Sequence, residues 1–113
     1  MEIVTPQQVI TELNRLQTLS EKGVQSLADA ELKLAEAENA FEKAFAHAIL
    51  KHEGGTAQTK EALAKLDTAD EKFAMQLARI ERDRVKNKLK QISEACVSVS
   101  VISRQVELQF RTS

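Results

Sequence analysis

The sequence predicts an all-α protein: an elongated, coiled-coil-like helical hairpin with a short N-terminal helix, assembled into an oligomer. Three observations predict it. Ala, Glu, Lys, Leu and Gln dominate the 113 residues, with four Phe and no Tyr or Trp, which suits long helices better than a multilayer core. Apolar residues recur at alternating steps of three and four. One strong turn, at Gly54 and Gly55, divides residues 1–113, which we expect to form a single domain, into nearly equal halves.

The first half begins with a helix start. Thr5 can cap a free amide, Pro6 suits the first helical position and Gln8 can complete a capping box. The seam that follows often has Ala or Gly at every second position, which lets a neighbouring backbone come close. Because residues 20–23 are its weakest stretch, we expect a break between a short helix over 5–22 and a long helix over 24–53. The seam comprises Val9, Leu13, Leu16, Ser20, Gly23, Leu27, Ala30, Leu34, Ala37, Phe41, Ala44 and Ala48.

The second half begins after the turn at residues 54–55, where Thr56 can cap a helix over 56–111. Its apolar stripe slips by about a residue, which indicates either a kink near residues 82–85 or a change of packing partner. The first part of the stripe comprises Leu63, Leu66, Phe73, Leu77 and Ile80. The second comprises Val85, Leu89, Ile92, Cys96, Val99, Val106 and Phe110.

The end of this second stripe bears on assembly. Residues 97–101 alternate with period two, as a strand would, but a lone strand leaves its backbone groups unpaired. We therefore predict a helix over residues 97–101 and keep strand pairing between subunits as an alternative.

Two long helices cannot cover the whole of this second stripe, so we expect it to meet the short N-terminal helix, other copies of the chain, or both, and to form a homo-oligomer interface. The expected interface residues are Val85, Leu89, Ile92, Val99, Val106 and Phe110.

The composition points to a soluble protein of the cytoplasm. No run approaches the ~18 apolar residues of a membrane span, and the first residues lack a signal-peptide apolar region. The one cysteine excludes an internal disulfide and CxxC metal sites. Net charge is -1, but residues 1–55 carry nine acids and five bases, whereas residues 56–113 carry eight acids and eleven bases. A polyanion should therefore meet the second half.

The sequence contains no recognisable set of catalytic residues. We therefore expect that the protein is not an enzyme and that it binds no cofactor or metal. His47 and His52 are five residues apart and lie on different faces of a helix, and we interpret both as surface residues near the turn. Cys96 lies on the apolar stripe and reads as a small buried hydrophobe. The Gly54–Gly55 pair lacks the preceding strand and the Gly-Lys-Ser/Thr of a phosphate loop.

The informative feature is a cluster of six bases and two acids over residues 79–90. At 100° per residue, Lys65, Lys72, Arg79, Lys86 and Lys90 share one face, a cationic ridge about 37 Å long. The ridge predicts a track for a phosphate backbone, read without sequence preference because aromatic residues are few. It also fits a solvated face with the surface pairs Glu61/Lys65, Asp83/Lys86 and Lys90/Glu94.

Over residues 30–110 the spacing resembles the UvsY-like recombination mediators of tailed phages. The resemblance is carried by the Gly-Gly turn, residues 66–73 (Leu-Asp-Thr-Ala-Asp-Glu-Lys-Phe) and the C-terminal pattern from Val85 to Phe110. It implies a hairpin that assembles into a ring, binds single-stranded DNA and helps load a RecA-like recombinase onto strands coated by single-strand-binding protein. The family's Leu-Lys-Ala-Arg-Leu motif is matched by Glu42–Ala46, which keeps Lys43 and Ala44 but has Phe45 in place of arginine.

The leading hypothesis is therefore a non-enzymatic, single-stranded-DNA-binding accessory protein of phage or prophage recombination in the bacterial cytoplasm. An alternative is a small phage inhibitor or adaptor that binds a host protein such as a nuclease or defence complex, through its acidic first half or its C-terminal stripe. A third, a two-helix secretion substrate, is disfavoured because no Trp lies beside the turn. The expected nucleic-acid-binding residues are Lys43, Lys51, Arg79, Arg82, Arg84, Lys86, Lys88 and Lys90.

Overall fold

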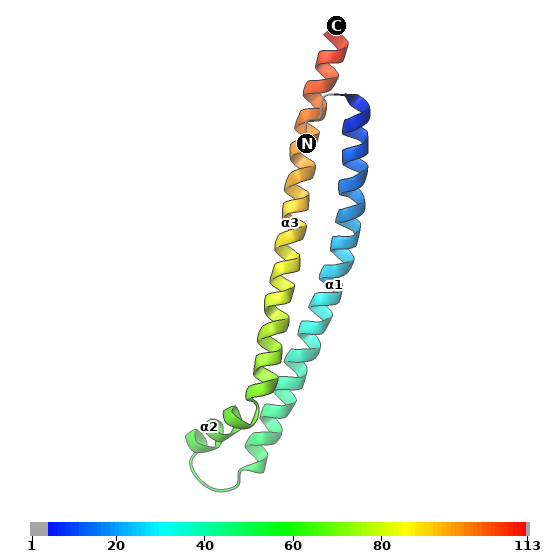
Figure 1. Ribbon diagram of the computed structural model, residues 1–113. Coiled ribbons are helices and arrows are strands. Elements are labelled where there is room, and N and C mark those ends of the chain that lie inside the picture. The colour runs from blue at the N-terminus through cyan, green and yellow to red at the C-terminus, as the bar shows by residue number, and fades with distance from the viewer. Residues whose placement is uncertain (1–4, 113) are drawn as a thin grey trace. The chain divides into compact units, whose positions relative to one another are not determined.

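The computed structural model describes residues 5–112, with the side chains of Phe110 and Thr112 excepted. Three helices follow one another: α1 (Pro6–Lys51), α2 (Ala57–Asp67) and α3 (Ala69–Thr112) (Figure 1). The described range contains no strand, and residues 97–101 are helical. The predicted all-α helical hairpin is confirmed.

The helix ends follow the capping signals in the sequence. Gln8 N donates to Thr5 Oγ1 and Thr5 N donates to Gln8 Oε1, each at 3.2 Å, so the capping box is present. Thr56 Oγ1 likewise accepts from the backbone N of Thr59 at 3.2 Å. Gly54 and Gly55 have φ of 82° and 83°, values that residues with a Cβ adopt only at a cost. The predicted turn is therefore confirmed.

α1 is continuous from residue 6 to residue 51, so the predicted break between helices at 5–22 and 24–53 is wrong. Gly23 explains the difference. A Cβ built on Gly23 would lie 2.8 Å from Leu89 Cδ1, so the missing side chain leaves the space that the leucine fills. Packing against α3 offsets the unfavourable helix propensity of glycine, about 1 kcal/mol, at this position.

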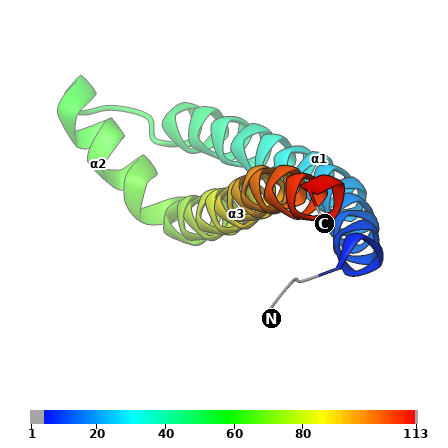
Figure 2. The ribbon, with the colours of Figure 1, turned by 90° about the horizontal axis from the view of Figure 1, so that it is seen from above.

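The second half is interrupted earlier than its sequence suggests. The predicted single helix over 56–111 is wrong, because α2 ends at Asp67 and α3 begins at Ala69. α3 is uninterrupted through residues 82–85, and a kink there stays a prediction. Thr68, only 2% exposed, lies between α2 and α3 with φ -112°, and its Oγ1 donates to Ala64 O at 2.7 Å. Both ribbon views show α2 standing to one side of the axis of α3 (Figures 1 and 2).

Contacts divide the chain into two compact units. We call residues 1–27 and 85–113 unit 1 and residues 28–84 unit 2. In each unit, a segment of α1 lies beside a segment of α3, and the two segments run antiparallel (Figure 1). Unit 2 also contains the turn and α2. The single domain stays a prediction, since both long helices run through both units.

Unit 1 has its own apolar core, formed by Val9 and Leu16 of α1 with Val99 and Val106 of α3. Val99 is 6% exposed and Val106 5% exposed. The N-terminal part of α1 covers both, which is the first of the two contacts expected for the stripe, so the expectation that these two side chains need another copy of the chain is wrong. The other described residues of the expected oligomer interface, Val85, Leu89 and Ile92, are half-buried, and the side chain of Phe110 lies outside the described residues. Repetition of the seam at four- and three-residue steps on both helices lets them cover each other.

Unit 2 turns its expected apolar stripe outward. Its buried residues are mostly small: Ala30, Leu34, Ala48, Ala64 and Thr68. The segment of α3 in this unit places Glu71, Met75, Ala78 and Arg82 at half-buried positions. The stripe predicted from the sequence is exposed instead, at 39% for Leu63, 75% for Leu66, 60% for Phe73, 50% for Leu77 and 65% for Ile80.

Candidate nucleic-acid interface

The eight basic residues expected to bind nucleic acid fall into both units. Unit 2 carries five of them: Lys43, Lys51, Arg79, Arg82 and Arg84. Unit 1 carries the other three: Lys86, Lys88 and Lys90. The three arginines have acidic partners, whereas no ion pair is found for any of the five lysines among the described residues.

The three arginines are engaged with acids. Arg79 Nη2 lies 3.8 Å from Glu38 Oε1 on α1, Arg82 Nε lies 2.7 Å from Asp83 Oδ1, and Arg84 Nη2 lies 2.8 Å from Glu81 Oε1. The hydrogen bond to Glu81 raises the pKa of the Arg84 guanidinium further above its ordinary value. Each acid competes with a phosphate for its arginine, so these residues are weaker anion sites than the sequence suggested.

The three lysines of unit 1 are different. Lys86, Lys88 and Lys90 are exposed, and no ion pair joins any of them to a carboxylate in the part of the chain that the structure describes. The expected pairs Asp83/Lys86 and Lys90/Glu94 are therefore not formed, and of the three expected pairs Glu61–Lys65 is found, at 3.6 Å. At 100° per residue, Lys86 and Lys90 lie about 40° apart on one face of α3, whereas Lys88 lies on the opposite flank.

The charges of the two units have opposite signs. By sequence, unit 1 contains seven basic and five acidic residues, a net charge of +2, whereas unit 2 contains nine basic and twelve acidic residues, a net charge of -3. An anionic strand would therefore meet less repulsion at unit 1. The charge count of the two sequence halves does not reveal this difference, because both long helices, α1 and α3, contribute to both units.

The basic residues of α1 lie apart from the lysine group along the sequence. Lys43 and Lys51 are both exposed, and Lys51 is the last residue of α1. The next residue, His52, lies near the turn as expected but is half-buried, and its Nε2 lies 2.7 Å from Asp67 Oδ2 at the end of α2. No local sequence signal indicates this contact across fifteen residues. It holds the turn between α1 and α2.

Few groups with catalytic chemistry come together. Among the described residues no three His, Cys, Asp or Glu side chains gather in a way that could hold a metal ion. His47 is exposed, and Cys96 is half-buried against the core of unit 1. Within residues 5–112 no helical stretch has both the length and the apolar character needed to cross a bilayer.

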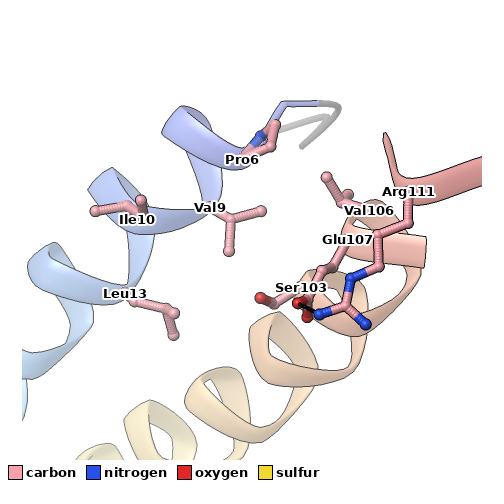
Figure 3. Close-up of a pocket in the computed structure, with 8 residues that line it drawn as sticks. All are labelled: Pro6, Val9, Ile10, Leu13, Ser103, Val106, Glu107 and Arg111. Carbon is pink, nitrogen blue, oxygen red and sulfur yellow. Dashed lines mark hydrogen bonds and ion pairs between the residues drawn. The ribbon is translucent and has the colours of Figure 1, made fainter. Parts of the chain in front are cut away.

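Unit 1 also has a cavity of about 350 Å³ between the start of α1 and the end of α3 (Figure 3). Val9, Ile10 and Leu13 lie on the α1 side and Val106 on the α3 side, where the Glu107–Arg111 ion pair, 2.7 Å long, lies at the edge. This lining suits an apolar group better than a phosphate. The cavity and the lysine group therefore suit different ligands, an apolar group and a phosphate respectively.

Comparisons with protein-family models, with curated proteins and with solved structures find no match to this chain.

Proposed function

We propose that the protein is a non-enzymatic, single-stranded-DNA-binding recombination mediator that helps load a RecA-like recombinase onto strands coated by single-strand-binding protein, in the bacterial cytoplasm during phage or prophage recombination. The observation that carries the proposal is the group of three exposed lysines, Lys86, Lys88 and Lys90, without acidic partners among the described residues. The spacing resemblance to UvsY-like mediators supports the recombination role.

The lysine geometry limits how strongly one chain binds. A strand following one face of α3 reaches Lys86 and Lys90 but not Lys88, and each neutralised phosphate lowers the salt slope of log affinity by about 0.7. One chain should therefore give a slope of about -1.4. A steeper slope requires several chains on one strand, as a homo-oligomeric mediator would provide.

The experiment is direct binding of a labelled single-stranded oligonucleotide by the full chain over a series of salt concentrations. Affinity that falls with salt and is equal for oligonucleotides of different sequence supports the proposal. If the protein binds no single strand at low salt, the mediator function is excluded.

A second candidate is an adaptor or inhibitor that binds a host protein. The observation that favours it is a group of outward apolar side chains on the α3 segment of unit 1: Val97 (64% exposed), Val101 (51%) and Leu108 (60%). Their spacing of four and seven residues places them on one helix face, the pattern of a helix that docks in a groove. This candidate would be supported by two results. The parent chain would bind no single-stranded DNA at low salt, and it would bind a host protein in a way that Val101→Asp abolishes.

A further inference from the structure

Unit 2 presents an unpartnered apolar face on α3. We call Phe73, Leu77 and Ile80 the outer seam; they are 60%, 50% and 65% exposed. Their steps of four and three residues repeat the spacing of a coiled-coil seam. At 100° per residue the three side chains span about 60° of the helix, so they form one continuous stripe.

The inner face of the same segment, which packs toward α1, carries fewer large apolar side chains than the outer face. Glu71, Met75, Ala78 and Arg82 are half-buried there, about 150° from the outer seam. Glu71 Oε2 is buried and has no hydrogen-bond partner among the described residues. The segment thus exposes three large apolar side chains while two charged ones, Glu71 and Arg82, are half-buried, the reverse of what packing against α1 alone would favour. A helix with two seams at heptad spacing is typical of a bundle in which it has two neighbours.

We infer that the outer seam packs antiparallel against the outer seam of a second copy of this chain, with the two-fold axis near Leu77. The charges at the two ends of the outer seam favour a second copy of the chain as the partner and an antiparallel direction. Asp70 and Arg84 are both exposed, lie on the face of the outer seam, and are each seven residues from Leu77. Arg84 also pairs with Glu81 of its own helix at 2.8 Å, and a guanidinium has donors for a second carboxylate. An antiparallel pair places Asp70 of one copy opposite Arg84 of the other at both ends, whereas a parallel pair would place like charges together.

Such a dimer is self-complementary, as a two-fold interface requires. It brings the α3 segments of unit 2 from two copies together, and the residues from which it is argued include none of the three lysines of unit 1. The inference therefore does not depend on the proposed DNA binding, and the two are tested by separate measurements.

The first test is sedimentation equilibrium of the full chain. The parent should show a mass of twice the 12.6 kDa chain at micromolar concentration. Leu77→Glu combined with Ile80→Glu should weaken dimerisation at least about tenfold with unchanged helicity by circular dichroism. Leu32→Glu is the matched control, because Leu32 is an equally exposed apolar residue of unit 2, at 60%, on α1. A monomeric parent, or a double variant that associates as tightly as the parent, would overturn the inference.

The second test distinguishes direction by disulfide cross-linking in a Cys96→Ser background, in which the chain has no other cysteine. Leu77→Cys should link to its own copy across the axis. Asp70→Cys should not, since fourteen residues of helix separate the two sites by about 21 Å, but it should link to Arg84→Cys of a second chain. If Asp70→Cys links to itself as readily as Leu77→Cys does, the helices are parallel and the proposed interface is wrong.

Discussion

Gly23 of α1 and Leu89 of α3 fit together in unit 1, with Leu89 Cδ1 only 2.8 Å from the place where a Cβ on Gly23 would lie. The contact is tighter than a side chain at residue 23 allows, yet the obstructing atom is the tip of a flexible side chain. A small addition at Gly23 is therefore tolerable, because Leu89 can rotate away. A large addition is not.

We accordingly expect Gly23→Leu to lower the free energy of unfolding by about 1–3 kcal/mol through overpacking. Leu89→Ala in the same chain should restore part of that loss, because it removes the obstructing atom. Urea denaturation followed by circular dichroism measures both variants. Val24→Leu, at a neighbouring position that is 58% exposed, should leave stability unchanged within about 0.5 kcal/mol. Equal effects at positions 23 and 24 would contradict the close contact.

Two valines of α3 provide a matched pair for the core of unit 1. Val99 is 6% exposed and Val97 is 64% exposed. Val99→Asp should destabilise the chain by roughly 2–5 kcal/mol, because a carboxylate would be buried without a partner, whereas Val97→Asp should have little effect. Thermal unfolding measures the difference. The core assignment fails if both variants melt at the same temperature.

The turn provides a test of backbone conformation alone. Gly54 has φ of 82° and no atom within 4 Å of the place of a Cβ, so Gly54→Ala should lower the free energy of unfolding by about 1–2 kcal/mol through the backbone. Gly54→Asn should lower it less, because Asn adopts this conformation more readily. Chemical denaturation compares the two, and an alanine variant as stable as the parent would show that the turn adopts another conformation.

The contrast between the lysines and the paired arginines gives matched variants for DNA binding. Replacement of Lys86, Lys88 and Lys90 by Gln should weaken binding of every single strand and flatten the salt dependence. Gln is a good helix former, so the change isolates charge. The same change at Arg79, Arg82 and Arg84 should weaken binding less, because acids already engage these guanidinium groups. Equal losses in fluorescence anisotropy would show that the ion pairs open for phosphate.

Glu12 and Arg15 predict a pH effect near the start of α1. Hydrogen bonds donated by Arg15 lower the pKa of the Glu12 carboxyl below its ordinary value. A lowered pKa in the folded state means that the interaction is present above the unfolded pKa and is lost as pH falls through the folded one. Arg15→Gln should raise the midpoint of the Glu12 carboxyl titration observed by NMR. An unchanged midpoint would mean that the pair is not formed in solution.

The sequence by itself determined the helices and their ends where the signals are local. Thr5, Gln8, Gly54, Gly55 and Thr56 act within a few residues of their own position, so capping and turn chemistry can be read directly from the chain. The end of α2 had a local signal too, in Thr68 followed by Asp70 and Glu71 in the first turn of α3. The apolar periodicity on both sides of it concealed that boundary.

Only the tertiary structure decided which face of each helix is buried and which charges are free. Gly23 is a weak helix residue in isolation, but it is a packing site once Leu89 lies against it. Phe73 and Ile80 carry a stronger apolar signal than Glu71 and Ala78, yet they lie outside. A helix can carry apolar residues at helical spacing on more than one face, and contacts with residues distant in sequence decide which face is buried. Pairing of Arg79 with Glu38 on another helix has the same origin, because separation along the chain does not encode distance in space.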